Sequence, residues 1–505
     1  MDYLPLVLSI LPFLVFIFLL FRKKTTLLLA SSITLGLYTI LAIFYWQILG
    51  SALYISYVKG ALLAFDIFII IFGAIFFLEL LKDLKIIKNI SYYLSSLSAD
   101  YRVQVILIAW FFEAFLEGTS GFGIPAAVAI PLLVGIGLSP FRALVVGLLG
   151  NSVASIFGAA GTPIKVGLAT LSVANVPIFA SIFNFVGVLI PVFMVWVVTS
   201  GRPNRKKEFL EAVPFALLSG FLFLIPSYFG AKFLGQEFPT IIGSIVGLIL
   251  VTISVKLKFL IPKNNVSLQK EDITQDKKEN KFSALKSFMP YLILVGFLIL
   301  AKVLIGHISI PLNLGFKTSF SLFNPGFIFI IVAILVSVIW KSKIRKLVNF
   351  SKTAFKGAIF PFLSIAAILA VVQIMINSGQ NSSGLASVIS LISDSFQSKL
   401  LPVFAPIAGA FGAFLTGSTT TSNVMFGTLL NSASLGIGFS TDIILSLLVV
   451  GAGLGSMMGL ADILTAEAIV GVKNQETKVV KAVILPCLLC LMIIALIGLK
   501  IFQVI

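Results

Sequence analysis

Long apolar windows alternate with short polar connections along the whole chain. A helix needs roughly 20 apolar residues to cross a hydrocarbon core of about 30 Å, and most windows approach or reach that length. They show no alternation of apolar and polar residues at every second position, which favours α-helices over a β-barrel. The pattern therefore predicts an all-α polytopic membrane protein with about 12–14 helical segments. We expect helices near residues 3–21, 26–48, 60–81, 102–117, 141–162, 176–199, 212–231, 240–258, 288–306, 326–340, 354–377, 399–416, 441–470 and 479–503.

The composition supports the same environment. Of 505 residues, 59% are hydrophobic and 11% are charged, whereas soluble domains are about half apolar and roughly a quarter charged. The formal net charge is +17, which in a soluble protein would suggest nucleic-acid binding. Here the basic residues gather in connections between apolar windows, as they do in the cytoplasmic loops of membrane proteins. We therefore expect a lipid bilayer, and no nucleic acid, as the partner.

The positions of the basic residues also predict the topology. The first window has no basic residue before it and three after it, which favours a true first span with its N-terminus outside over a cleaved signal peptide. The hydrophilic segment 263–287 predicts a cytoplasmic linker between a first half, 1–262, and a second half, 288–505. Basic clusters at 22–24, 82–88, 202–207, 256–286 and 341–346 are expected inside, and connections at 50–58, 232–240, 306–326 and 378–384 outside.

Parts of the first half recur in order in the second half. Residues 114–120 (AFLEGTS) match 413–419 (AFLTGST), and two later stretches follow at nearly the same separation. The first repeat motif, 113–163, follows a basic segment, whereas the second, 413–470, follows a lysine-poor one. The two copies are therefore expected to enter the membrane from opposite faces, as inverted repeats.

Each copy is interrupted by a polar motif, EGTSGFGIP at 117–125 and TGSTTTSN at 416–423. Glycine permits sharp turns and Pro125 lacks a donor, so we expect a re-entrant hairpin there, followed in each half by a broken helix. Unpaired backbone groups at membrane depth need a protein-lined or wet cavity, and a half-helix N-terminus suits a carboxylate. The alternative is that small and hydroxyl residues simply pack helices closely. The predicted substrate-binding residues are Gly118, Thr119, Ser120, Gly121, Asn151, Ser152, Gly417, Ser418, Thr419, Thr420, Ser422 and Asn423.

Ionisable residues at membrane depth are costly and usually functional. Glu113 and Glu117 lie one helical turn apart, directly before the first break. Because burial favours the neutral form of a carboxylic acid, Glu117 is the leading candidate for proton coupling, with Glu113 and Asp66 as further candidates. Alternatively, Glu117 caps the nearby half-helix, Glu113 has only a supporting role, and Asp66 belongs to a hydrogen-bonded scaffold. Lys165 is a candidate partner of the anion or of a glutamate, or else it extends to the interface.

These motifs carry a family resemblance. Residues 117–125, the stretch from Asn151 to Pro163 and residues 416–423 together resemble the lactate permease family, over most of the chain. The resemblance implies proton-coupled uptake of L-lactate, and often glycolate, across the plasma membrane.

Two positions depart from the family pattern. The family commonly has an acidic residue at the position of Thr419 and a lysine within 455–459, where this chain has Ser456, Met457 and Met458. Anion binding is then expected to depend more on hydroxyls and backbone NH groups, with Asp462 and Glu467 as candidates to replace the missing pair.

The leading hypothesis is therefore a proton symporter of a small monocarboxylate. Its nearest alternative is a sodium-coupled carboxylate transporter of the same architecture, and a passive channel is a third. An intramembrane metalloenzyme would need clustered ligands, yet the one histidine, His307, is expected in an external loop. Cys487 and Cys490 are interpreted as packing residues. We expect no cofactor and no metal, and the oligomeric state, a homo-oligomer included, stays open.

Overall fold

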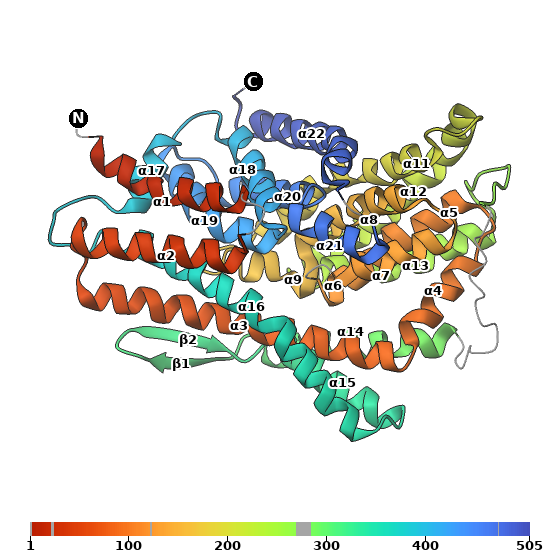
Figure 1. The fold of residues 1–505 in the computed structure, drawn as a ribbon, viewed down its shortest axis with the longest axis horizontal. Helices are drawn as coiled ribbons and strands as arrows, with labels where there is room; N and C mark the ends of the chain where they lie inside the picture. Colours follow the sequence, from red (N-terminus) through yellow and green to blue (C-terminus); the bar gives the residue numbers. More distant parts are fainter. Residues whose placement is uncertain (1–2, 22–24, 122–123, 269–283, 473, 505) are drawn as a thin grey trace.

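The computed structural model describes residues 3–21, 25–121, 124–268, 284–472 and 474–504, and Figure 1 shows their arrangement. The first half contains α1 (Leu4–Phe21), α2 (Leu27–Phe44), α3 (Gly50–Asp83), α4 (Ile86–Ser96), α5 (Tyr101–Val105), a π-helix (Ile106–Phe112), α6 (Glu113–Thr119), α7 (Ile124–Gly135), α8 (Pro140–Ala154), α9 (Gly158–Lys165), α10 (Val176–Phe183), α11 (Ile190–Thr199), α12 (Arg205–Leu234) and α13 (Pro239–Lys256). The second half contains α14 (Ala284–Ile305), α15 (Pro325–Ile339), α16 (Ile344–Asn377), α17 (Val388–Ser395), α18 (Leu401–Thr416), α19 (Thr419–Gly436), α20 (Thr441–Ser456), α21 (Leu460–Val470) and α22 (Glu476–Ile501).

The predicted fold class, an all-α polytopic membrane protein, is confirmed. Within the described residues, ten helices are long and apolar enough to cross a membrane. Large apolar side chains such as Phe18, Phe233 and Val338 are exposed on the outer faces of helices, where lipid would cover them. The two strands among the described residues, β1 (Ser309–Asn313) and β2 (Lys317–Ser321), form a hairpin in the connection predicted at 306–326.

Several helix bounds differ from the sequence prediction. The segment 50–58, expected as an external connection, is the first part of α3. Polar residues lowered its hydropathy, but they are satisfied within the helix, as when Ser56 Oγ donates to the Ala52 carbonyl oxygen at 2.8 Å. Helices α12 and α16 likewise extend into the basic clusters at their N-terminal ends. The short helix α4 was missed because it is amphipathic and buries only a narrow stripe that includes Ile86, Ile90 and Leu94.

The expected breaks are present in both halves. In the first half, α6 ends at Thr119 before α7, and α8 is separated from α9 by a turn of 3-10 helix at Ser155–Phe157. In the second half, α18 and α20 end before α19 and α21 in the same order. Residues 122–123 of the first motif lie outside the described residues. The inverted relation of the two copies stays a prediction.

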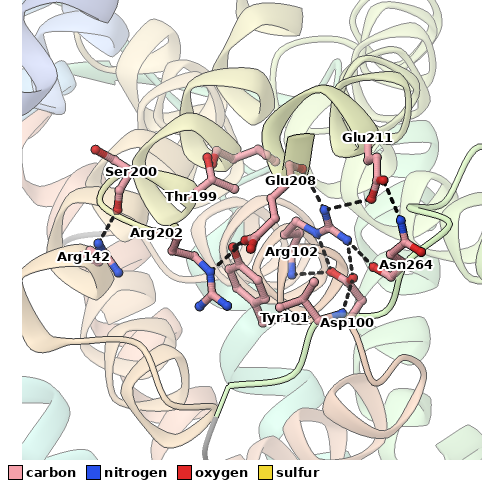
Figure 2. Close-up of polar contacts among 12 residues, drawn as sticks. Asp100, Tyr101, Arg102, Arg142, Thr199, Ser200, Arg202, Glu208, Glu211 and Asn264 are labelled. Carbon is pink, nitrogen blue, oxygen red and sulfur yellow. Dashed lines mark hydrogen bonds and ion pairs between the residues drawn. The ribbon is translucent and has the colours of Figure 1, made fainter. Parts of the chain in front are cut away.

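A buried polar network, which we call the Arg102 network, fixes the start of the helix that leads to the first motif (Figure 2). The Asp100 carboxylate accepts hydrogen bonds from Arg102 Nε at 2.9 Å and Nη2 at 2.6 Å, and from the Val266 amide at 3.1 Å. Arg102 also donates to the carbonyl oxygens of Glu208 at 2.7 Å and Asn264 at 2.7 Å. The buried guanidinium and carboxylate are thus each held by several partners.

The same network binds the beginning of the predicted linker. Asn264 Nδ2 donates to Glu211 Oε1 at 2.7 Å, and the Tyr101 amide donates to the Val266 carbonyl oxygen at 3.1 Å. Residues 264–266 are therefore docked on the first half. Residues 269–283 of the predicted linker fall outside the described residues, and its last residues, 284–287, are the beginning of α14 and not part of a linker.

Candidate functional site: a polar cavity between the two halves

The two polar motifs line one cavity, which we call the central cavity. Its volume is about 70 Å³, and by this measure a water molecule needs roughly 10–15 Å³, so it has room for several waters or one small organic acid. The first half contributes Glu117, Gly121, Asn151, Ser155, Gly158, Ala159, Thr162 and Pro163, and the second half contributes Gly417, Ser418, Thr419, Thr420, Ser456 and Asp462.

On the second-half side, the cavity wall is the N-terminus of α19. Gly417 ends α18 with a φ of 66°, a left-handed conformation that glycine adopts without steric cost. Ser418 then caps α19, because its Oγ accepts a hydrogen bond from the Thr421 amide at 3.1 Å. The amides of Thr419 and Thr420 come before that bonded amide, where an α-helix offers no acceptor. A partial positive charge therefore faces the cavity.

On the first-half side, the principal group is the carboxylate of Glu117. The side chain is buried and packs against Gly158, where a Cβ atom would collide with Glu117 Oε1. The Asn151 amide group lies beside this carboxylate. Glu117 Oε2 and Asn151 Oδ1 have no hydrogen-bond partner among the described residues. Buried polar atoms are nearly always paired, so these two mark a place for a ligand, a proton or water.

The first turn of α9, directly after the break, has a strained backbone. Ala159, Ala160 and Gly161 have φ angles of 44°, 51° and 77°, all in the left-handed region that alanine rarely adopts. The two alanines cost of order 1–3 kcal/mol each, and such strained residues cluster at functional sites, whereas Gly161 adopts this conformation without steric cost. The left-handed turn places Ala159 and Thr162 on the cavity wall.

A chain of hydroxyl groups joins the two halves at the cavity. Thr419 Oγ1 donates to Ser155 Oγ at 3.3 Å, and Ser155 Oγ lies 3.3 Å from Ser456 Oγ. Thr419 and Ser456 belong to the two segments in which the family commonly has an acidic residue and a lysine. In this chain they are bridged by hydroxyls instead, and Met457 is a buried residue at the end of α20.

Seven of the predicted site residues line the central cavity: Glu117, Gly121, Asn151, Gly417, Ser418, Thr419 and Thr420. Other residues that were predicted to bind substrate lie outside the cavity lining and contact neighbouring helices or their own helix. Gly118 lies against Ile241 of α13, and Thr119 Oγ1 donates to the Phe115 carbonyl oxygen at 3.0 Å. Ser120 is buried outside the cavity lining.

Three further predicted residues bond to backbone carbonyls. Ser152 Oγ donates to Leu149 at 2.7 Å and Ser422 Oγ donates to Gly409 at 2.7 Å. Asn423 Nδ2 donates to the Pro163 carbonyl oxygen at 2.9 Å, so it links α19 to the broken helix of the other half. These hydroxyls and this amide hold the cavity wall and do not line it.

Three further charged candidates, Glu113, Asp66 and Lys165, lie outside the lining of the central cavity. Glu113 is completely buried one turn before Glu117, and neither of its carboxylate oxygens has a hydrogen-bond partner among the described residues. Asp66, on α3, lies in a second cavity near the β-hairpin and accepts a hydrogen bond from Asn324 Nδ2 on its main-chain oxygen at 3.1 Å. Lys165 Nζ donates to the Phe323 carbonyl oxygen at 2.9 Å.

Sequence reasoning missed Ser155, Thr162 and Ser456 as cavity residues. Ser155 follows Asn151 by four positions, directly after the end of α8, so helical periodicity was a signal for it. Asp462, considered only as a replacement charge, lines the cavity, whereas Glu467 accepts a hydrogen bond from the Gln475 amide at 2.9 Å instead. His307 is exposed in the turn after α14, and both cysteines are buried.

The fold and this cavity define a class of protein. In a polytopic membrane protein, broken helices from two distant parts of the chain meet around a polar site, which is an arrangement found in secondary transporters.

Comparisons with known proteins identify the family. The family model for L-lactate permease matches residues 5–308 and 305–505, so the chain belongs to the L-lactate permease family. It is 26% identical to the L-lactate permease of Bacillus subtilis, over 93% of this chain and 90% of that protein. It is also 26% identical to a putative L-lactate permease of Haemophilus influenzae, over 85% of each chain. A glycolate permease of Escherichia coli is 26% identical over 80% of this chain and 79% of its own length.

Proposed function

We propose that this protein is a secondary active transporter that imports a small monocarboxylate, such as L-lactate or glycolate, by proton symport. The observation that carries the proposal is the central cavity, where the N-terminus of α19 faces the incompletely paired carboxylate of Glu117. The names of the relatives supply the substrate class.

The N-terminus of α19 is the proposed carboxylate site. Two amides that lack intrahelical acceptors, the helix dipole and the hydroxyls of Thr419 and Thr420 suit the two oxygens of a carboxylate. Ser155 and Ser456 are the proposed partners of the α-hydroxyl of the substrate, since they line the same cavity and carry hydroxyls.

Charge balance favours proton coupling. Glu117 and Asp462 both line the cavity, so an incoming carboxylate would be the third acidic group in a small volume with a low dielectric constant. Like charges repel strongly in such surroundings. Uptake of one proton, most directly by Glu117 with its free Oε2, lowers that cost and links substrate binding to the proton gradient.

A sodium-coupled mechanism is the second candidate. The carboxylates of Glu117 and Asp462, with the hydroxyls of Ser155 and Thr419, offer the oxygen ligands that a hard cation prefers. In that case Na⁺, rather than a proton, would balance the added charge.

The proposed setting is the plasma membrane with the N-terminus outside. In Figure 1 the N-terminus and the β-hairpin lie toward one end of the molecule, and α4 and α5 lie toward the other. The connection before α4 and the docked segment 264–266 belong to the basic regions expected in the cytoplasm.

Counterflow with the purified protein in liposomes tests the proposal. Vesicles loaded with unlabelled L-lactate should take up labelled L-lactate transiently, and a panel of small carboxylates then defines the specificity. Imposed gradients separate the coupling ions, because an inwardly directed proton gradient should drive accumulation and a sodium gradient at constant pH should not. Accumulation that follows sodium alone would replace proton symport with the second candidate, and absence of exchange with every acid would refute the transporter.

A further inference from the structure

A second group of charges, which we call the Lys165–Glu237 cluster, lies outside the central cavity. Glu237, in the turn between α12 and α13, is almost completely buried. Lys302 Nζ, from α14, lies 3.2 Å from Glu237 Oε1 and 3.1 Å from Oε2. Lys165 Nζ, at the end of α9, lies 4.0 Å from Glu237 Oε1. The Glu237 carboxylate is therefore shared unequally between two ammonium groups.

An aromatic ring completes the cluster. The ammonium of Lys165 lies 4.9 Å from the centre of the Phe323 ring, and that of Lys302 lies 5.0 Å from it. The faces of aromatic rings attract cations, so the ring helps to hold two like charges near each other. Among the residues that the structure describes, Lys165 donates one hydrogen bond, to the Phe323 carbonyl oxygen, and an ammonium has three donors.

The cluster lies next to structural elements that line both cavities. Gly161, in the strained turn of the central-cavity wall, packs so closely on the 236–237 turn that a Cβ atom there would collide with the Gln236 carbonyl oxygen. On the other side, Asp66 interacts electrostatically with Lys165 and lines the second cavity, of about 310 Å³, which Lys59 and Thr318 of the hairpin strand also line. Lys165 therefore lies two residues after Pro163, which lines the central cavity, and interacts with Asp66, which lines the second cavity.

We propose that Glu237 is an internal carboxylate that competes with the transported carboxylate for Lys165. In the arrangement seen here Glu237 sits in a site built for a carboxylate, with two ammonium groups and an aromatic ring around it. An arriving monocarboxylate takes the donors of Lys165, and Glu237 stays with Lys302, its closer partner. The competition keeps the lysine site from retaining the anion, because transport needs binding that is strong enough for entry and weak enough for release.

This inference rests on the proposed function and makes opposite predictions for the two partners of one ion pair. Glu237→Gln removes the competitor, so the KM for L-lactate counterflow should fall about threefold to tenfold. Lys302→Gln leaves Glu237 to Lys165 alone, so KM should rise by about the same factor. A purely structural ion pair would respond alike to both changes, because either one breaks it.

The double variant Glu237→Gln/Lys302→Gln removes both charges and leaves no unpaired buried carboxylate, so it remains informative if a single variant folds poorly. Its KM should stay below that of the wild type. Lys232→Gln is the matched control, because it removes a lysine near the same turn but outside the cluster, and its KM should equal that of the wild type.

The outcomes separate this inference from the proposed function. If the wild type exchanges L-lactate but Glu237→Gln and Lys302→Gln leave KM unchanged or move it in the same direction, Glu237 is no competitor and the transporter stands. If the wild type exchanges no small carboxylate, the proposed function fails and this inference fails with it.

Discussion

The Arg102 network and the central cavity are both buried, polar and charged, yet they treat their carboxylates in opposite ways. Asp100 accepts hydrogen bonds on both oxygens from a guanidinium and from a backbone amide, all within the protein. Glu117 has one oxygen, Oε2, with no hydrogen-bond partner among the described residues, and its neighbour Asn151 has another unpaired atom. The first arrangement is complete without a ligand, and the second is not.

Buried charges are rare in a membrane protein, and this difference distinguishes those that stabilise the fold from those that belong to a binding site. A fully paired buried charge stabilises one conformation, since any movement would break several hydrogen bonds. An incompletely paired buried charge is tolerated where a ligand, a proton or water completes it. The comparison therefore predicts that substitutions in the Arg102 network impair folding, whereas substitutions in the cavity impair transport.

The largest expected effect is on the folded state. Arg102→Met should destabilise the protein by about 3–5 kcal/mol, because it leaves the Asp100 carboxylate buried without its cation. Thermal unfolding monitored by size-exclusion chromatography in detergent measures this. Lys346→Ala is the control, since it breaks an exposed ion pair of 2.7 Å with Asp83 and should cost less than about 1 kcal/mol. Equal melting temperatures for Arg102→Met and the wild type would contradict the expectation that the Arg102 network stabilises the folded state.

Glu117→Gln should act on transport instead. Proton-driven accumulation should fall at least about tenfold, which corresponds to ~1.4 kcal/mol, whereas counterflow exchange continues. Glutamine has nearly the same size as glutamate, and it removes a buried acidic group that is incompletely hydrogen-bonded. The melting temperature should therefore not decrease. Both are measured on the same reconstituted preparation, and accumulation at the wild-type level would exclude Glu117 from coupling.

A smaller effect is expected from the hydroxyl chain. Thr419→Val removes the hydroxyl that reaches Ser155, so the KM for substrate should rise about threefold to tenfold, in line with ~1 kcal/mol for one hydrogen bond. Thr419→Ser keeps the hydroxyl and should retain most of the wild-type affinity. If the valine and serine variants behave alike, the methyl group rather than the hydroxyl determines the effect.

The smallest effect is expected at Glu113, where both carboxylate oxygens lack a hydrogen-bond partner among the described residues. Glu113→Met replaces this acid with an apolar side chain of similar length and should raise the free energy of unfolding by about 1 kcal/mol, with little change in transport. Thermal unfolding and proton-driven uptake measure the two parts. A loss of accumulation comparable to that of Glu117→Gln would instead place Glu113 on the proton path.

Much of the fold was predictable because lipid restricts the choices of the backbone. The lengths of the apolar windows predicted most of the helices. The glycines and hydroxyl residues at 117–125 and 416–423 predicted breaks that the structure contains. The start of α3, the helix α4 and the β-hairpin were not predicted, since their polar residues are satisfied by local bonds or by packing that hydropathy does not register.

The candidate site was predictable in part, for a related reason. Motif residues were identified, but the direction of each side chain depends on how the chain turns after a break. Thr119 therefore bonds to its own helix, whereas Glu117, two positions earlier, lines the cavity. Contacts such as that of Thr419 with Ser155 join residues far apart in the sequence, and no local pattern contains them.

The burial of Cys487 and Cys490 in α22 has a practical consequence. They are the two cysteines of the chain, and the tight packing around them shields both sulfur atoms from water-soluble reagents. A maleimide fluorophore added to the folded protein should therefore label an introduced cysteine selectively. Pairs of such labels on opposite sides of the central cavity would test by energy transfer whether the molecule opens and closes, without first replacing native residues.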